Sequence, residues 1–182
     1  TLMDFEELGL LELIIQRGPE ALDGLPKEMR DNQESMAEAI ENNVRRTIVD
    51  ENPVNPKYYE RMSVLLDELI DLRRQQAISY QEYLEKVREL AKQVKYPQSH
   101  SQSAYPESID TAAKRALYDN LGKDELLVAR IDTAVRYTKK ADWYGDRFKE
   151  REIAFAIAEE TKGYDVTVAE VMELVKAQQE YH

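Results

Sequence analysis

The chain has 182 residues, no cysteine and a formal net charge of -11 at pH 7. The lack of cysteine excludes a disulfide framework, a thiolate zinc site and a cysteine nucleophile, and it fits a reducing cytoplasm. The negative charge disfavours broad binding to nucleic acid or anionic lipid, and no apolar run approaches the ~20 residues of a membrane span, so we expect a cytoplasmic protein with no membrane partner.

The composition favours an all-α fold, because charged residues reach 34% while only six glycines are present. The first predicted helix covers residues 3–16. An irregular connection follows, with breakers at Gly18, Pro19, Gly24 and Pro26. A second helix is predicted from about residue 31 to 50, and the spacing of Glu41 and Arg45 predicts a surface ion pair within it.

A helical hairpin at residues 57–95 is the centre of the predicted fold. Pro53 and Pro56 separate it from the preceding helix, since proline suits a first turn and not a helix interior. Apolar residues recur at three- and four-residue steps on both sides of a short turn. Ser79 and Glu82 have the spacing of a capping box at the start of the second helix.

Residues 96–107 are polar, contain two prolines and show no periodicity, which predicts an exposed loop. This loop separates a first helical half, 1–95, from a second, 108–182, and we expect the two to pack as one domain. In the second half, helices are predicted to end at Gly122, to begin after Asp124, to span 147–161 and to begin after Thr167. The sum is a multi-helix bundle of about seven or eight helices with no strand.

No sequence motif of an active site is present. There is no glycine-rich phosphate loop, and neither His100 nor His182 lies on a predicted helix with a carboxylate at ligand spacing. The sequence therefore predicts no catalytic, cofactor or metal site. The acids Asp67, Glu68 and Asp71 alternate with apolar residues, so we interpret them as the solvated face of a helix.

A local excess of positive charge stands out between residues 136 and 151, where six basic residues meet three acids. The basic residues are Arg136, Lys139, Lys140, Arg147, Lys149 and Arg151, and Trp143 and Tyr144 lie among them. Three interpretations stay open: an ordinary surface in which Trp143 covers the core, a protein contact, or a phosphate-binding patch with stacking aromatics. The same three interpretations apply to Arg73 and Arg74. The simplest is that they are cations at a helix C-terminus, where the helix dipole favours positive charge.

Three blocks of the sequence resemble a known family. They are residues 41–94, which include NPKYYERMSVLLDELI and ISYQEYLEKV, residues 105–121 (YPESIDTAAKRALYDNL) and residues 142–160 (DWYGDRFKEREIAFAIAEE). Their order resembles the C-terminal helical region of the restriction (R) subunit of type I restriction-modification enzymes, over about residues 5–178.

The resemblance implies a non-catalytic helical domain of a larger subunit, whose nuclease domain and ATP-hydrolysing, DNA-translocating motor domains have no counterpart here. ATP and Mg would belong to that parent, so no cofactor or catalytic residue is carried over. The implied partners are the methyltransferase and specificity subunits and the subunit's own motor domains, with DNA bound through the parent. A chain that starts at Thr1 fits a piece of a longer protein, although a processed terminus explains it too.

Two further functions are weighed against this assembly role. One is direct contact with duplex DNA through the basic residues of 136–151. The other is an independent helical enzyme or metal protein, which the histidine and cysteine inventory disfavours.

Overall fold

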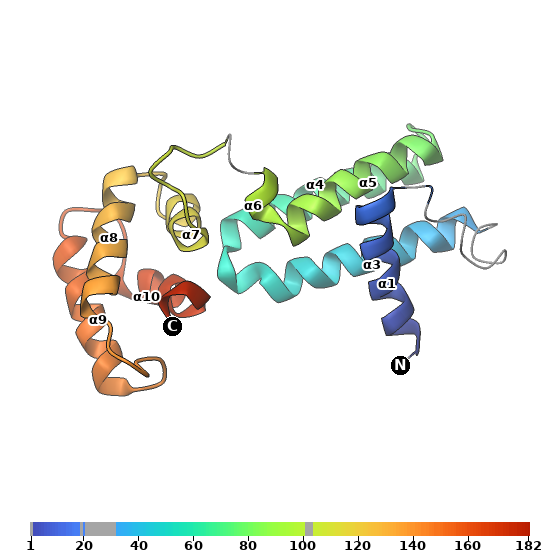
Figure 1. The fold of residues 1–182 in the computed structure, drawn as a ribbon. Coiled ribbons are helices and arrows are strands. Elements are labelled where there is room, and N and C mark those ends of the chain that lie inside the picture. The colour runs from blue at the N-terminus through green and yellow to red at the C-terminus, as the bar shows by residue number, and fades with distance from the viewer. Residues whose placement is uncertain (1, 19, 21–31, 101–103) are drawn as a thin grey trace. The chain divides into compact units, whose positions relative to one another are not determined.

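The computed structural model describes residues 2–18, 20, 32–100 and 104–182, and over these residues the protein is all α-helical without a strand (Figure 1). The irregular connection predicted after residue 16 lies mostly outside the described residues. The longer helices are α1 (Leu2–Arg17), α3 (Gln33–Glu51), α4 (Pro56–Arg74), α5 (Tyr80–Lys95), α7 (Ala112–Asn120), α8 (Glu125–Thr138), α9 (Arg147–Glu160) and α10 (Val168–Ala177). The short ones are α6 (Pro97–His100), η2 (Asn52–Val54) and η3 (Gln179–Tyr181). Among the described residues, no helix is long and apolar enough to cross a membrane.

The chain forms two compact units. The first comprises residues 1–51 and 59–100, and the second comprises residues 52–58 and 101–182. The sequence analysis grouped residues 52–58 with the first half, whereas their contacts tie them to the second unit.

The helical hairpin of the first unit is confirmed. Helices α4 and α5 are joined by residues 75–79, and at the far end the Tyr59 hydroxyl donates to the Val94 carbonyl at 3.2 Å, so the two helices are antiparallel. The Ser79 hydroxyl accepts from the Glu82 amide at 3.1 Å, which supplies the predicted N-cap. Helix α1 packs on α3 and α5 (Figure 1).

The predicted surface pair between Glu41 and Arg45 is wrong. Glu41 is only 4% exposed and accepts from Arg73 Nε at 2.7 Å and Nη2 at 2.9 Å. The Tyr83 hydroxyl donates to the same carboxylate at 2.7 Å, and the Arg73 guanidinium lies 5.7 Å from the Tyr83 ring centre. Arg73 pairs with Glu41 in place of Arg45, because a buried carboxylate needs an opposite charge and several hydrogen-bond donors. Arg45 instead pairs with Asp67, which is exposed.

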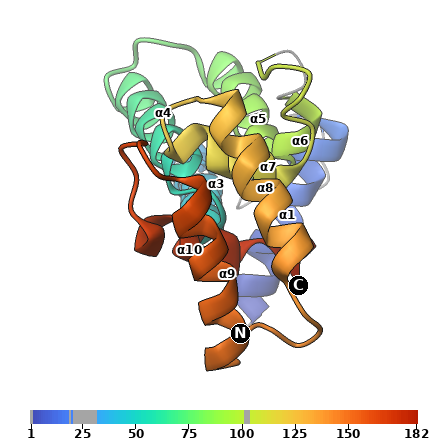
Figure 2. The same ribbon diagram turned by 90° about the vertical axis from the view of Figure 1, so that its left-hand side faces the viewer.

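The second unit has one apolar core, formed by α7, α8, α9, α10 and η3. Its largest members are fully buried: Leu117, Leu127, Ile131, Trp143, Ile153, Ile157 and Tyr181. Helices α8 and α9 lie side by side in both views (Figures 1 and 2). Helix α10 begins with the predicted capping box, in which Thr167 and Glu170 exchange hydrogen bonds.

The proline-rich turn before α4 is held in the second unit by side-chain amides. Asn55 donates to Asp119 at 2.9 Å and accepts from Asn120 at 2.7 Å. The Gln178 side chain donates to the Val54 carbonyl at 2.8 Å. Of the backbone groups in this turn, the Val54 carbonyl at the end of η2 thereby gains a hydrogen-bond donor.

The exposed loop predicted at 96–107 is only partly correct. Residues 97–100 form α6, and residues 101–103 lie outside the described residues. Tyr105 is half-buried, donates its hydroxyl to Asp119 and packs edge-on against Tyr118 at 5.8 Å between ring centres. The polar composition of the segment did not predict this contact, because a single aromatic residue such as Tyr105 has little effect on the average composition.

We predict that Arg73→Met destabilises the protein by about 3 kcal/mol, because it leaves the buried Glu41 carboxylate without its charge partner. Arg45→Met, which removes an exposed pair, should cost less than about 1 kcal/mol. Urea denaturation followed by far-UV circular dichroism measures both. The double variant Glu41→Leu/Arg73→Met should regain most of the loss, since the Tyr83 hydroxyl keeps the Ala37 carbonyl at 3.4 Å. Equal losses in the two single variants would contradict the assignment.

Candidate functional site

The basic segment 136–151 spans the end of α8, a turn and the start of α9. Gly145 has φ +85 and Asp142 has φ +56, and both values suit a tight turn. Asp146 caps α9 by accepting from the amides of Phe148 and Lys149. The helical parts follow the sequence prediction, and the positions of the side chains decide what the segment can bind.

Arg136 is committed to the protein's own acids. Its Nε lies 3.0 Å from Asp132 Oδ1, and its Nη2 donates to Glu180. The buried Tyr181 hydroxyl donates to the same Asp132 oxygen at 2.6 Å, and the guanidinium lies 5.0 Å from the Tyr181 ring centre. Burial, reinforced by the bond to Asp132, raises the pKa of Tyr181. This triad is therefore a structural junction between α8 and η3.

Lys139 and Trp143 hold the backbone of residue 181. The Lys139 ammonium donates to the Tyr181 carbonyl at 3.1 Å, and Trp143 Nε1 donates to the same oxygen at 2.8 Å. Trp143 is 1% exposed, which fits the interpretation in which it covers the core and leaves its side chain no surface for a partner. Tyr144 is exposed, and its ring centre lies 4.7 Å from that of His182. Trp143 and Tyr144 thus contact residues 181–182 of their own chain.

The remaining basic residues divide into bound and available ones. Lys140 pairs with Glu152 at 2.9 Å, and Lys149 donates to the Ala141 carbonyl at 2.7 Å. Arg147 and Arg151 are exposed, and within the described part of the chain neither has an acidic partner. Local composition overstated the available positive charge, because acids outside the segment pair with Arg136 and Lys140 and backbone carbonyls hold Lys139 and Lys149.

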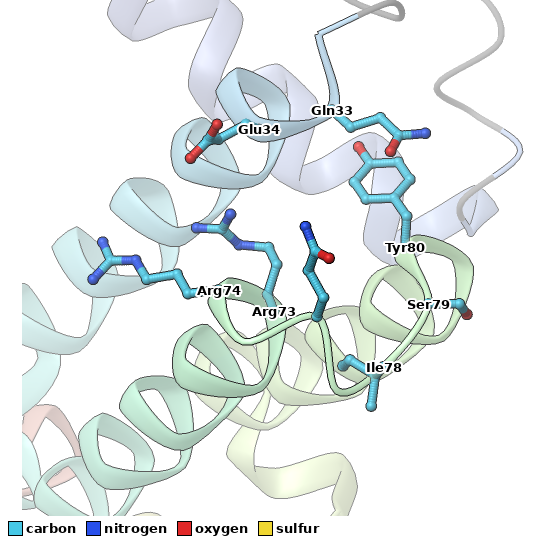
Figure 3. A pocket seen from close by; sticks show the side chains of 8 residues that line it. Gln33, Glu34, Arg73, Arg74, Ile78, Ser79 and Tyr80 are labelled. Carbon is cyan, nitrogen blue, oxygen red and sulfur yellow. The ribbon is translucent and has the colours of Figure 1, made fainter.

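Arg73 and Arg74 line a polar hollow of about 360 Å³ at the hairpin turn (Figure 3). Arg73 is engaged by Glu41, while Arg74 is exposed. Glu34 and the side chains of Gln33 and Tyr80 also face the hollow (Figure 3). The lining mixes both signs of charge, so it offers an anion no strong excess of positive charge.

The sequence analysis missed an apolar groove on the outer face of α8 and α9. Two aromatic side chains form its walls: Tyr137 is 91% exposed and Phe155 is 69% exposed. The small residues Ala134 and Ala156 also line the groove, which has a volume of about 650 Å³. A usable signal existed, since both aromatics fall outside the buried stripe of an amphipathic helix.

Ion pairs between the two helices bracket this groove. Arg130 lies 4.0 Å from Glu160 at one end, and Lys140 lies 2.9 Å from Glu152 toward the other. Their charges balance, and Glu159, which also lines the groove, pairs with Lys162 at 2.9 Å. The groove therefore presents aromatic and aliphatic surface with little net charge. Exposed apolar surface of this kind is typical of a protein contact.

The described residues contain no group of three or more histidine, cysteine, aspartate or glutamate side chains placed to hold a metal ion. In comparisons with known proteins, no family model matches the chain, and no curated protein or solved structure matches it. The resemblance to type I restriction subunits thus depends on the three sequence blocks alone.

We predict that Tyr181→Phe destabilises the second unit by about 1–3 kcal/mol near neutral pH, because Asp132 stays buried with one donor fewer. The fluorescence of Trp143, which is the chain's single tryptophan, reports unfolding of this unit.

The same variant gives a test at alkaline pH. The folded-state pKa of Tyr181 is raised above its ordinary value of 10.0. Its contribution to the free energy of unfolding is therefore fully present below pH 10 and is lost as the pH rises further. The free energy of unfolding of the native sequence should fall by up to about 1.4 kcal/mol per pH unit from this group. The free energy of unfolding of Tyr181→Phe should fall less steeply with pH. Parallel curves for the variant and the native sequence would contradict the bond between Tyr181 and Asp132.

Proposed function

We propose that this chain is a non-catalytic docking domain, and that it serves as the C-terminal helical part of a type I restriction R subunit. In that role it binds the methyltransferase and specificity core and supports the motor domains of its own subunit. The cytoplasm is where such a complex acts. The family assignment comes from the three sequence blocks, and the docking role has support from the surface of the second unit.

The observation that carries the docking role is the groove walled by Tyr137 and Phe155. Aromatic side chains dominate the binding energy of protein interfaces, and here two of them are held on neighbouring helices with most of their surface in water. The helices fix the backbone positions of both residues before binding, so association does not have to order a loop. A groove between two helices also matches the shape of a partner helix.

Direct contact with duplex DNA is the second candidate. It retains support from Arg147 and Arg151, which are exposed. The other four basic residues of the segment each have an acceptor within the unit: Arg136, Lys139, Lys140 and Lys149. With two available cations in this segment of a chain of charge -11, we expect weak binding at most.

We predict that Tyr137→Ser/Phe155→Ser weakens binding to the methyltransferase and specificity core by about a hundredfold. The reason is that each lost aromatic side chain removes about 1–2 kcal/mol of binding free energy. Co-elution and calorimetric titration of the purified chain with that core measure the effect. Both positions are exposed, so the free energy of unfolding should change by less than about 0.5 kcal/mol each.

A matched control is Val49→Ser/Val64→Ser, which removes exposed apolar side chains of the first unit and should leave the affinity unchanged. Failure of the native chain to bind the core, or assembly of the R subunit with unchanged affinity after deletion of this domain, would reject the proposed function.

For the DNA alternative, Arg147→Gln/Arg151→Gln should abolish duplex binding and lower the slope of log affinity against log salt by about two. Fluorescence anisotropy with a labelled duplex at low salt measures both. Undetectable binding by the native chain would remove this alternative.

A further inference from the structure

A second groove lies on the outer face of the α4–α5 hairpin in the first unit. It has a volume of about 400 Å³, and its apolar lining consists of Leu65, Leu69, Leu72 and Leu90. The first three are spaced four and three residues apart, so they share one face of α4. Leu65 and Leu72 are each 38% exposed, while Leu69 and Leu90 are buried beneath them.

The rim of this groove is acidic. Glu68 stands on α4, and Glu85 and Glu89 stand on α5, against the single cation Lys86, so three acids and one base give a net charge of -2. All three carboxylates are exposed. Glu89 has Lys92 at 3.2 Å, whereas Glu68 and Glu85 have no ion pair with any described residue. The groove thus combines a leucine floor with an unbalanced negative border.

We propose that this acidic leucine groove binds an amphipathic α-helix of another protein, one that presents an apolar stripe flanked by lysine and arginine. Two antiparallel helices leave a groove that accepts the apolar side chains of a third. From Leu65 to Leu72 the groove runs along two helical turns, about 10 Å, which suits partner side chains at i, i+3 or i+4, and i+7. The glutamates then lie beside the partner's cations, which sets both orientation and selectivity.

Charge argues against the other occupants. A second copy of this chain, placed by a two-fold axis, would bring the two acidic rims together and would repel. Nucleic acid and anionic membranes carry the same sign as the rim and would be repelled too. A basic helix is the partner whose charge the groove complements.

This inference goes beyond the proposed function, since the groove lies on the other unit and has different chemistry from the groove of Tyr137 and Phe155. Either can fail alone. The peptide test below uses Tyr137→Ser/Phe155→Ser to separate them, because that variant should bind the peptide with unchanged affinity.

The test uses a fluorescently labelled synthetic helix of leucine and lysine, about 18 residues long so that it can form a helix. Its affinity for the full chain is measured by fluorescence anisotropy. The groove variant is Glu68→Lys/Glu85→Lys/Glu89→Lys. The matched control is Glu38→Lys/Asp50→Lys/Glu51→Lys, which makes the same change in net charge at exposed positions of α3.

We expect the lysine peptide to bind the native chain, the groove variant to weaken binding about tenfold or more, and the control variant to weaken it by about twofold at most. Leu72→Gln should also weaken binding, with far-UV circular dichroism showing that each variant is folded. A peptide with glutamate in place of lysine should not bind.

Three results would overturn the inference. The first is no binding of the lysine peptide, and the second is equal weakening by the groove and control variants, which would mean attraction by net charge alone. The third is a dimer in sedimentation equilibrium that the groove variant abolishes, which would make a second copy the occupant.

Discussion

Each unit of this protein is built around one buried carboxylate that a tyrosine hydroxyl and an arginine satisfy together. In the first unit Glu41 accepts from Tyr83 at 2.7 Å and from Arg73 at 2.7 Å. In the second, Asp132 accepts from Tyr181 at 2.6 Å and from Arg136 at 3.0 Å. In both triads the guanidinium also lies over the tyrosine ring. Burying a carboxylate costs several kcal/mol, so these partners must all be present.

The triads determine which surfaces are left for binding. Arg73 and Arg136 are bound to these carboxylates and are not available to an external ligand. Burial raises the pKa of Tyr83 and of Tyr181, so both hydroxyls stay protonated and donate hydrogen bonds. In the basic segment 136–151, Lys139, Lys140 and Lys149 are likewise held by acceptors of their own unit. The available features are then apolar grooves between helices, which favour protein contact over phosphate binding.

The helices could be predicted from the sequence because their signals are local. The capping box of Thr167 and Glu170 and the apolar stripe of α5 lie within one or two turns of chain. The triads could not, since Glu41 meets residues 32 and 42 positions away. A signal was present nonetheless: Glu41 and Asp132 each stand on the apolar stripe of their helix, four residues after Ala37 and Val128. An acid in an apolar position predicts a buried partner.

The surface was harder to predict than the helices, for a related reason. Whether Arg136 or Lys140 is free depends on Glu180 and Glu152, which local composition around residue 140 does not include. Trp143 illustrates the same limit: its neighbours in sequence are polar, but its indole is buried against η3. Tertiary packing sets the exposure of such residues, so a basic and aromatic segment is weak evidence for nucleic-acid binding.

The two proposed grooves differ in the charge around them, so they would select partners of different chemistry. The groove of Tyr137 and Phe155 is bracketed by balanced ion pairs, so shape and aromatic contact determine what it binds. The acidic leucine groove rejects acidic helices by repulsion, because the carboxylates of Glu68 and Glu85 would face like charges. Selectivity by repulsion requires no additional exposed apolar area. The net charge of -11 acts in the same way between copies of the chain, because it opposes their nonspecific association.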